Sequence, residues 1–264
     1  MDFRVLAVGD VCGDVGLQLL ERRLRPLRRQ YNVDFCVVNG ENASGVGIIP
    51  RQAEMIFSAG ADVITLGNHS YSRREIEGYL EDSPYILRPA NDSHLCPGRG
   101  FGVYDTKAGP VAVVNLIGRC GMAYGPDNPF LLAEKLLKQI DTRIVLVDFH
   151  AEASSEKLAL AYHLDGNVSA LWGTHTHVPT ADNQIFPGGT GYVTDLGMTG
   201  PIRSVLGVRV EQSIASFREG RSRHYDTAPG PCKLEALLFT IDSNTGRCTA
   251  TERILYHDTT ASRG

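Results

Sequence analysis

The sequence contains no hydrophobic run that approaches the roughly 20 apolar residues of a membrane-spanning helix. Its N-terminal segment, MDFRVLAVGD, holds one short strand-like run that leads into Gly and Asp. This segment lacks the cationic start and the small-residue cleavage site of a secretory signal. We therefore expect a cytoplasmic protein that has no membrane partner.

An excess of charge of one sign is also absent. Lys and Arg number 26 against 30 Asp and Glu, so the formal net charge is only −4. The chain has no general basic field that would hold long nucleic acid by its phosphates. A small anionic substrate remains compatible with this charge, because bound metal ions dominate the electrostatics of their own site.

Cysteines are few and do not form motifs. The six cysteines are scattered without a CxxC pair, at Cys12, Cys36, Cys96, Cys120, Cys232 and Cys248. In a chain of 264 residues this pattern is typical of reduced thiols in a core and not of a disulfide framework.

The chain shows no internal repeat, low-complexity tract or linker, so we expect one domain over residues 1–264, with a frayed tail at 257–264. Short runs rich in β-branched residues predict buried strands at 3–8, 34–38, 62–66, 111–116, 144–147 and 168–172. Helix-like segments separate these runs, which indicates an α/β fold whose sheets are covered by helices. Two further runs, 233–242 and 248–255, flank Ser-Asn-Thr-Gly and predict an antiparallel hairpin.

One helix is predicted from apolar residues at steps of three and four. Its apolar face consists of Leu17, Leu20, Leu24, Leu27 and Tyr31. The arginines between them are interpreted as a solvated face and not as a nucleic-acid patch. Pro26 is expected to end or bend the helix, because proline has no N–H and its ring clashes with the preceding turn.

Polar residues that can bind metals or protons follow five of the predicted strands. These segments are Gly9-Asp10, Asn39-Gly40-Glu41-Asn42, Gly67-Asn68-His69, Asp148-Phe149-His150 and Gly173-Thr174-His175-Thr176-His177. In open α/β sheets, ligands bind beyond the carboxyl ends of the strands, so these side chains are placed to converge.

Each of these segments alone has a simpler explanation. Gly-Asp and Asn-Gly-Glu-Asn are common in turns and helix caps. His175 and His177 lie two positions apart in a segment that we expect to be extended, so their side chains point the same way. That pair fits either metal ligation or a hydrogen-bonded structural role. Together, the five strand ends favour a metal site.

The residue types narrow the choice of metal. Oxygen and imidazole donors without thiolate suit Mn²⁺, Fe²⁺ or Zn²⁺ better than Ca²⁺. The carboxylates and histidines are numerous enough for two ions that share one bridging ligand. Two metal ions about 4 Å apart polarise a phosphoryl oxygen and lower the pKa of a bridging water, which then attacks as hydroxide. The pattern therefore predicts a two-metal phosphoesterase.

These motifs resemble those of the calcineurin-like metallophosphoesterases, whose hallmarks are a Gly-Asp strand end, a Gly-Asn-His and a late Gly-x-His-x-His turn. The closer resemblance is to the YmdB-like branch. The segments that carry it are GDVCGDVG (9–16), NGENASGVG (39–47), ITLGNH (64–69), LRPAN (87–91), DFHAEASSEKLAL (148–160), GTHTHVPTAD (173–182) and DLGMTGP (195–201). They occur in the expected order, and the C-terminal hairpin also fits.

The resemblance implies a four-layer α/β/β/α sandwich with two mixed sheets. It also implies a phosphodiesterase that acts on small phosphodiesters, notably 2′,3′-cyclic nucleotides, with two divalent cations (Fe or Mn, with Zn or Mg as alternatives). Carried over by position, the ligands of one metal would be Asp10, Glu41, Asn42 and His177. The ligands of the other would be Glu41, Asn68, His150 and His175, with Glu41 as the bridge. His69 would protonate the leaving oxygen.

The sequence departs from the broader superfamily in three places. Cys12 stands where the superfamily has a histidine, and Glu41 stands where it usually has a bridging Asp. Both departures fit the YmdB-like branch, and we interpret Cys12 as a buried thiol. After His69, Ser-Tyr-Ser stands where that branch more often has Trp and Asp. Tyr71 is a candidate platform for stacking a base, and ordinary packing explains it equally well.

Other polar residues have simpler interpretations. Glu152, Ser155, Glu156 and Lys157 look like the start of a helix, where capping is their expected role. Glu152 is also a candidate for orienting a ligand histidine, as are Asp148 and Asp182.

Alternative functions remain open on the sequence alone. A metal-dependent amidohydrolase barrel also uses a His-x-His pair, although that pair is expected on the first strand. A regulatory module that binds a nucleotide or an RNA end would use the same ligands with incidental turnover. A phosphomonoesterase and a homo-oligomer are both compatible with the sequence.

Overall fold

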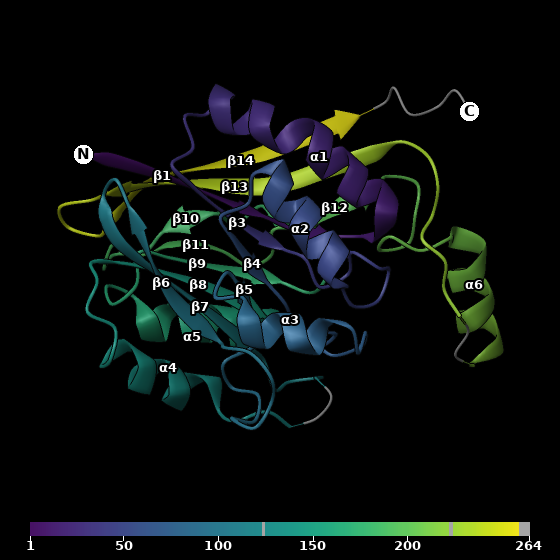
Figure 1. The fold of residues 1–264 in the computed structure, drawn as a ribbon, viewed down its shortest axis with the longest axis horizontal. Coiled ribbons are helices and arrows are strands. Elements are labelled where there is room, and N and C mark those ends of the chain that lie inside the picture. Colours follow the sequence, from purple (N-terminus) through teal and green to yellow (C-terminus); the bar gives the residue numbers. More distant parts are fainter. Residues whose placement is uncertain (123–124, 222–223, 259–264) are drawn as a thin grey trace.

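The computed structural model describes residues 1–122, 125–221 and 224–258 (Figure 1). Its first sheet is mixed, in the strand order β2-β12-β13-β1-β3-β4-β5, with β14 paired to β13. Parallel pairing joins β1, β3 and β4, whereas β13 runs antiparallel to β1. The strands are β1 (Asp2–Val8), β2 (Asp10–Val11), β3 (Phe35–Asn39), β4 (Val63–Thr65), β5 (Ile86–Leu87), β12 (Met198–Pro201), β13 (Cys232–Asp242) and β14 (Cys248–Asp258).

The second sheet is also mixed, in the order β10-β11-β9-β8-β7-β6. Its central strands β7, β8, β9 and β11 run parallel, and an antiparallel strand lies at each edge. The strands are β6 (Phe101–Thr106), β7 (Gly109–Ile117), β8 (Ile144–His150), β9 (Ala170–Thr174), β10 (Gln184–Ile185) and β11 (Gly191–Val193).

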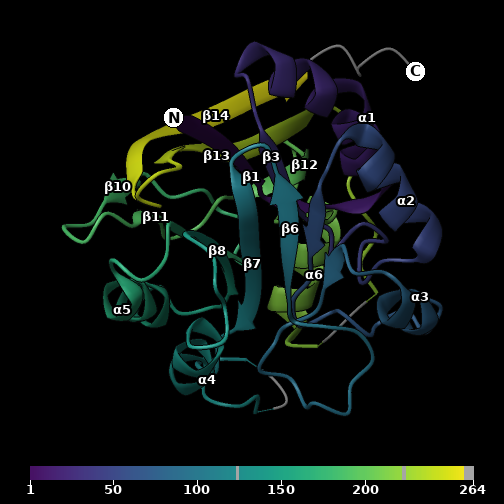
Figure 2. The same cartoon turned by 60° about the vertical axis from the view of Figure 1, so that its left-hand side comes forward.

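Helices cover the outer face of each sheet. Figure 2 shows α1 and α2 on one side of the molecule and α4 and α5 on the other. The first sheet is covered by α1 (Gly13–Gln30), α2 (Pro50–Ala59) and α3 (Ile76–Asp82), and the second by α4 (Pro129–Leu137) and α5 (Ser154–Leu164). A sixth helix, α6 (Val210–Glu219), stands apart from the layers (Figure 1). None of these helices in the described part of the chain is long and apolar enough to cross a bilayer.

Three apolar cores separate the four layers. One lies between α1–α3 and the first sheet, one between the two sheets, and one between the second sheet and α4–α5. The middle core buries Trp172 and Phe239, whose rings lie 5.8 Å apart. This arrangement confirms the expected α/β/β/α sandwich and rules out a closed amidohydrolase barrel.

Each strand predicted from the sequence forms, with bounds that shift by at most a few residues. The predicted hairpin forms, as β13 and β14. The predicted tail is wrong at His257 and Asp258, because these residues extend β14 and pair with Lys233 and Cys232. Residues 259–264 lie outside the described part of the chain.

Pro26 does not end helix α1, which continues past this residue to Gln30. Pro26 is exposed, while Leu24 and Leu27 on either side of it are buried. Burial of the predicted apolar face stabilises the helix enough to offset the backbone hydrogen bond that the proline removes.

The cysteine prediction holds for four of the six residues. All six are free, and Cys12, Cys36, Cys232 and Cys248 are buried. Cys96 is only partly buried and Cys120 is exposed, so these two are not core thiols.

Candidate metal centre

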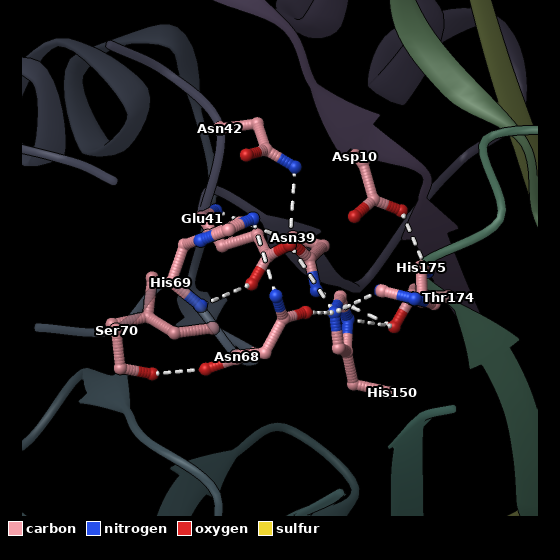
Figure 3. A network of polar contacts seen from close by, with 12 residues as sticks. Asp10, Asn39, Glu41, Asn42, Asn68, His69, Ser70, His150, Thr174 and His175 are labelled. Atoms are coloured by element: carbon pink, nitrogen blue, oxygen red, sulfur yellow. Dashed lines mark hydrogen bonds and ion pairs between the residues drawn. The ribbon is translucent and has the colours of Figure 1, made fainter. Parts of the chain in front are cut away.

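Strand ends from both sheets meet at one place. Asp10, Glu41 and Asn68 follow β1, β3 and β4 of the first sheet, while His150 and His175 stand at the ends of β8 and β9 of the second. Figure 3 shows these side chains pointing toward a common centre. The hydrophobic strands are buried, so the polar side chains that follow them are carried into the interior as well.

A chain of hydrogen bonds places a proton on His150 Nδ1. The Thr174 hydroxyl donates to Asp148 Oδ1 at 2.7 Å, so the oxygen of Thr174 can only accept from His150 Nδ1, which lies 2.9 Å away. Burial raises the pKa of Asp148 to about 6, and the hydroxyl groups of Thr65 and Thr174 stabilise its ionised form. His150 Nδ1 therefore carries a proton, and Nε2 is the ring nitrogen that faces the centre.

His150 Nε2 faces the lone pairs of three acceptor atoms on other residues. Within 3.2 Å of His150 Nε2 lie Glu41 Oε1 (3.2 Å), Asn68 Oδ1 (2.9 Å) and His175 Nδ1 (3.0 Å). Burial lowers the pKa of His150, but the charge and hydrogen bond of Glu41 together with the charges of Asp10 and Asp148 outweigh this and raise it above its ordinary value. A single proton cannot satisfy three acceptors, whereas a cation at their centre would satisfy all of them.

The ligand atoms of Glu41, His150 and His175 all lie within 4.8 Å of one another. Gly67 makes room for this group, because a Cβ at that position would lie 2.3 Å from His150 Nε2 and 2.4 Å from Glu41 Oε2. The Gly in Gly67-Asn68 is thus required by the close approach of the ligands.

A second group of donors lies around Asp10. His177 Nδ1 donates to the Leu206 carbonyl at 3.0 Å, and its Nε2 points into the centre, 3.6 Å from Asp10 Oδ1 and 3.2 Å from Asn42 Nδ2. Asp10 is fully buried, yet its Oδ1 has no hydrogen-bond partner among the described residues. Burial opposes its ionisation, but the charges of His177 and His150 outweigh this and lower its pKa to about 2. An ionised oxygen without a hydrogen-bond partner, with an imidazole nitrogen 3.6 Å away, fits a cation.

His69 lies at the edge of this centre. Its backbone N–H donates to Glu41 Oε2 at 3.2 Å, and its Nε2 lies 3.1 Å from the Asn68 amide nitrogen (Figure 3). Cys12 is buried with its Sγ 3.5 Å from His177 Nδ1, the nitrogen that faces away from Asp10. The thiol therefore packs behind His177, as expected.

Comparison with known proteins gives the family. Residues 6–254 match the family model described as YmdB-like protein. The chain belongs to the YmdB-like family. This membership confirms the family expected from the motifs, and with it the enzyme class, that of the phosphoric diester hydrolases.

Relatives of this YmdB-like chain align over almost its whole length. A 2′,3′-cyclic-nucleotide 2′-phosphodiesterase of Bacillus subtilis is 40% identical, and the match covers 97% of each chain. A phosphatase of Mycoplasma pneumoniae of known structure is 32% identical with a TM-score of 0.93, covering 98% of this chain and 95% of its own. The crystal structure of a hypothetical protein from Thermus thermophilus is 37% identical with a TM-score of 0.91, covering 97% and 100%.

The segment that carries the two late histidines is not extended, contrary to expectation. Strand β9 ends at Thr174, and His175 and His177 both have left-handed backbones, with φ of 96° and 61°. Residues without the freedom of glycine rarely adopt this conformation unless their surroundings hold them there. Asp195 supplies that restraint, since its Oδ2 accepts from the backbone N–H and the hydroxyl of Thr176 at 3.2 and 2.8 Å.

Lys157 completes this restraint. Its Nζ donates to Asp195 Oδ2 at 2.7 Å, and both side chains are buried. The interpretation of this region as a helix cap is therefore wrong for Lys157. It is also wrong for Glu156, which accepts from the backbone of Arg119 and Cys120, because α5 starts at Ser154 without a side-chain cap.

Other polar residues of the YmdB-like chain divide into two groups. Glu152 Oε2 lies 3.1 Å from His175 Nε2, so it is placed to orient that ring. Asp182 instead accepts from Thr180 and Thr194 and touches no ligand candidate among the described residues. Asp195 was missed in the sequence, although it follows β11 just as the other acids follow their strands.

The buried ion pair yields a stability prediction. Lys157→Met leaves the Asp195 carboxylate buried without its cation, so we expect the free energy of unfolding to fall by about 3–5 kcal/mol. Denaturant unfolding measures this change. Lys157→Met combined with Asp195→Asn should recover part of the loss, and Glu134→Gln, at an exposed pair with His163, should change little. A wild-type unfolding curve for Lys157→Met would contradict the prediction.

Proposed function

We propose that this chain binds two divalent cations and hydrolyses small phosphodiesters, 2′,3′-cyclic nucleotides above all. The observation that carries the proposal is the contact of His150 Nε2 with three lone-pair atoms in a buried site, which is more acceptors than one proton can satisfy. Support for the substrate class comes from the Bacillus subtilis relative, whose name gives 2′,3′-cyclic nucleotides as its substrates. Fe or Mn is the proposed metal, with Zn or Mg as the alternatives.

The donors divide into two proposed sets. Asn68, His150 and His175 would hold one cation, and Asp10, Asn42 and His177 the other. Glu41 lies between them: its Oε1 is 3.2 Å from His150 Nε2 and accepts from Asn42 Nδ2 at 3.0 Å. When bound, the two cations would neutralise the phosphate and supply an activated water.

In this proposal His69 is held in place beside the metal ligands and supplies a proton. His69 carries its imidazole beside Asn68 and is held there by its own backbone N–H on Glu41. Its Nδ1 lies 3.4 Å from the Ser72 hydroxyl, on the side away from the metal ligands. His69 is therefore placed to donate a proton to the departing ribose oxygen, which would otherwise leave as a strongly basic alkoxide.

An assay with matched substrates tests this function. The protein, chelated and then reconstituted with Mn²⁺, Fe²⁺ or Zn²⁺, is offered 2′,3′-cyclic AMP, bis(p-nitrophenyl) phosphate, p-nitrophenyl phosphate and a peptide amide. We expect cleavage of the two diesters, dependence on added metal, and slow or no cleavage of the others. Preference for the monoester would favour a phosphomonoesterase, and nucleotide binding without turnover would favour a regulatory module.

The bridging role of Glu41 predicts an effect on stability. Divalent metal should raise the melting temperature of the wild type, because it binds the folded state and relieves repulsion among buried donors. In Glu41→Gln this rise should shrink sharply, and metal content after dialysis should fall. Glu81→Gln, at an exposed position of α3, is the control and should behave like the wild type. An equal metal-induced rise in Glu41→Gln would contradict the bridge.

The proton donor role of His69 predicts a different pattern. His69→Ala should keep its metal content, because its backbone N–H to Glu41 is retained, yet kcat should fall about 10²–10⁴-fold. Steady-state rates with bis(p-nitrophenyl) phosphate and metal analysis of the same sample measure both. The exposed His257→Gln serves as the control. Unchanged kcat across the pH range would reject this role.

A further inference from the structure

A cavity of about 660 Å³ opens directly beside the metal centre. It shares Gly67 and Asn68 with that centre, and Tyr71, Asp92 and Cys96 line its other parts. Its volume lies within the range of small-molecule sites in proteins, which bury most of their ligand. Ser72, which contacts His69, also lines it, so the cavity lies on the side where the leaving group would depart.

Tyr71 gives this cavity an aromatic wall. Its hydroxyl donates to the Pro97 carbonyl at 2.8 Å, and its ring packs against the apolar core beneath α1–α3. Both contacts hold the ring in place. A fixed aromatic side chain stacks on a nucleobase at little cost in conformational entropy, whatever the base. Tyr71 therefore favours a planar ligand without choosing among bases.

Asp92 is the residue of this cavity that can distinguish one base from another. Its carboxylate is partly buried and lines the cavity, yet none of the described residues donates a hydrogen bond to it. The nearby Arg88 donates from Nη1 to the carbonyls of Pro89 and Ala90 at 2.7 and 3.4 Å, and no hydrogen bond between its described atoms and Asp92 is formed. Burial raises the pKa of Asp92, and the charge of Arg88 opposes that rise. A desolvated carboxylate without donors calls for donors from a ligand.

The nucleobases differ in what they offer to a carboxylate. Guanine presents two adjacent donors, N1–H and the N2 amine, which match the two oxygens of a carboxylate. Adenine and cytosine each place a ring-nitrogen acceptor beside their single amine, and uracil places carbonyl oxygens on either side of one N–H. An acceptor opposite a carboxylate oxygen is repelled. The chemistry of Asp92 thus matches guanine best.

We propose that this cavity binds the base of the nucleotide substrate and that Asp92 selects guanine through a two-fold hydrogen bond, with Tyr71 as the stacking surface. The proposal deepens the function proposed above and rests on it for the position of the phosphate. Under this assignment the residues of the metal centre cleave any diester, and Asp92 decides which nucleoside is preferred.

The test compares two ligands that differ only in the base. Calorimetric titration of the Mn²⁺-reconstituted full chain with guanosine 3′-monophosphate and adenosine 3′-monophosphate gives the ratio of the two dissociation constants. We expect the wild type to bind the guanosine ligand at least about tenfold more tightly, as a two-fold hydrogen bond to a base edge provides. In Asp92→Asn the ratio should fall close to one, and in Asp105→Asn, which removes an exposed charge on β6, it should stay as in the wild type.

The outcomes separate the proposed role of Asp92 from the proposed function of the metal centre. Because each variant is compared with itself, a partial loss of folded protein does not alter its ratio. Equal affinities in the wild type, or an unchanged guanine preference in Asp92→Asn, would overturn the proposal. If the wild type cleaves bis(p-nitrophenyl) phosphate but shows no guanine preference, the cavity assignment fails while the proposed function stands. If it cleaves no diester and still prefers guanine through Asp92, the cavity assignment stands while the proposed function fails.

Discussion

The site depends on one electrostatic constraint, which is that buried lone pairs face one another with too few protons between them. Thr174 and Asp148 hold a proton on His150 Nδ1, while Nε2 lies within 3.2 Å of acceptor atoms of Glu41, Asn68 and His175, which one proton cannot satisfy together. Folding brings these atoms together, since they stand at the ends of buried strands. Such an arrangement is costly without a cation and favourable with one, so metal binding and folding stability are coupled here.

Each sheet contributes different residue types to this centre. The first sheet delivers acids and amides after β1, β3 and β4, and the second delivers the imidazoles after β8 and β9. Behind the imidazoles, Asp148 and Asp195 hold Thr174 and Thr176 by hydrogen bonds, and Lys157 neutralises Asp195 in the interior. These supporting residues matter because a ligand set binds metal tightly only when its orientation is fixed before the metal arrives.

The strand ends were predictable because hydrophobic strands and polar residues that follow them leave a local signal. The neighbouring positions of Glu41 and Asn68 follow from that signal and from the parallel pairing of β3 and β4, whereas the approach of His150 depends on how the two sheets pack. The left-handed turn at His175 and His177 could not be predicted from the sequence, because a contact of Thr176 with Asp195, which lies 19 residues further along the chain, imposes it. The buried pair of Lys157 and Asp195 was likewise hidden, as a lysine at a helix start looks like an ordinary surface residue. Pro26 within α1 shows tertiary packing outweighing a local preference.

A reaction follows from this geometry only if cations occupy the two donor sets. The YmdB-like family supplies the context, and the cavity lined by Tyr71 and Asp92 is where we propose that the nucleoside binds. Anomalous diffraction from crystals grown with Mn²⁺, recorded on both sides of the manganese absorption edge, tests occupancy most directly. The account predicts two peaks on either side of Glu41, one next to His150 and His175 and the other next to Asp10 and His177. Crystals that contain Mn²⁺ but show no peak between these side chains would contradict it.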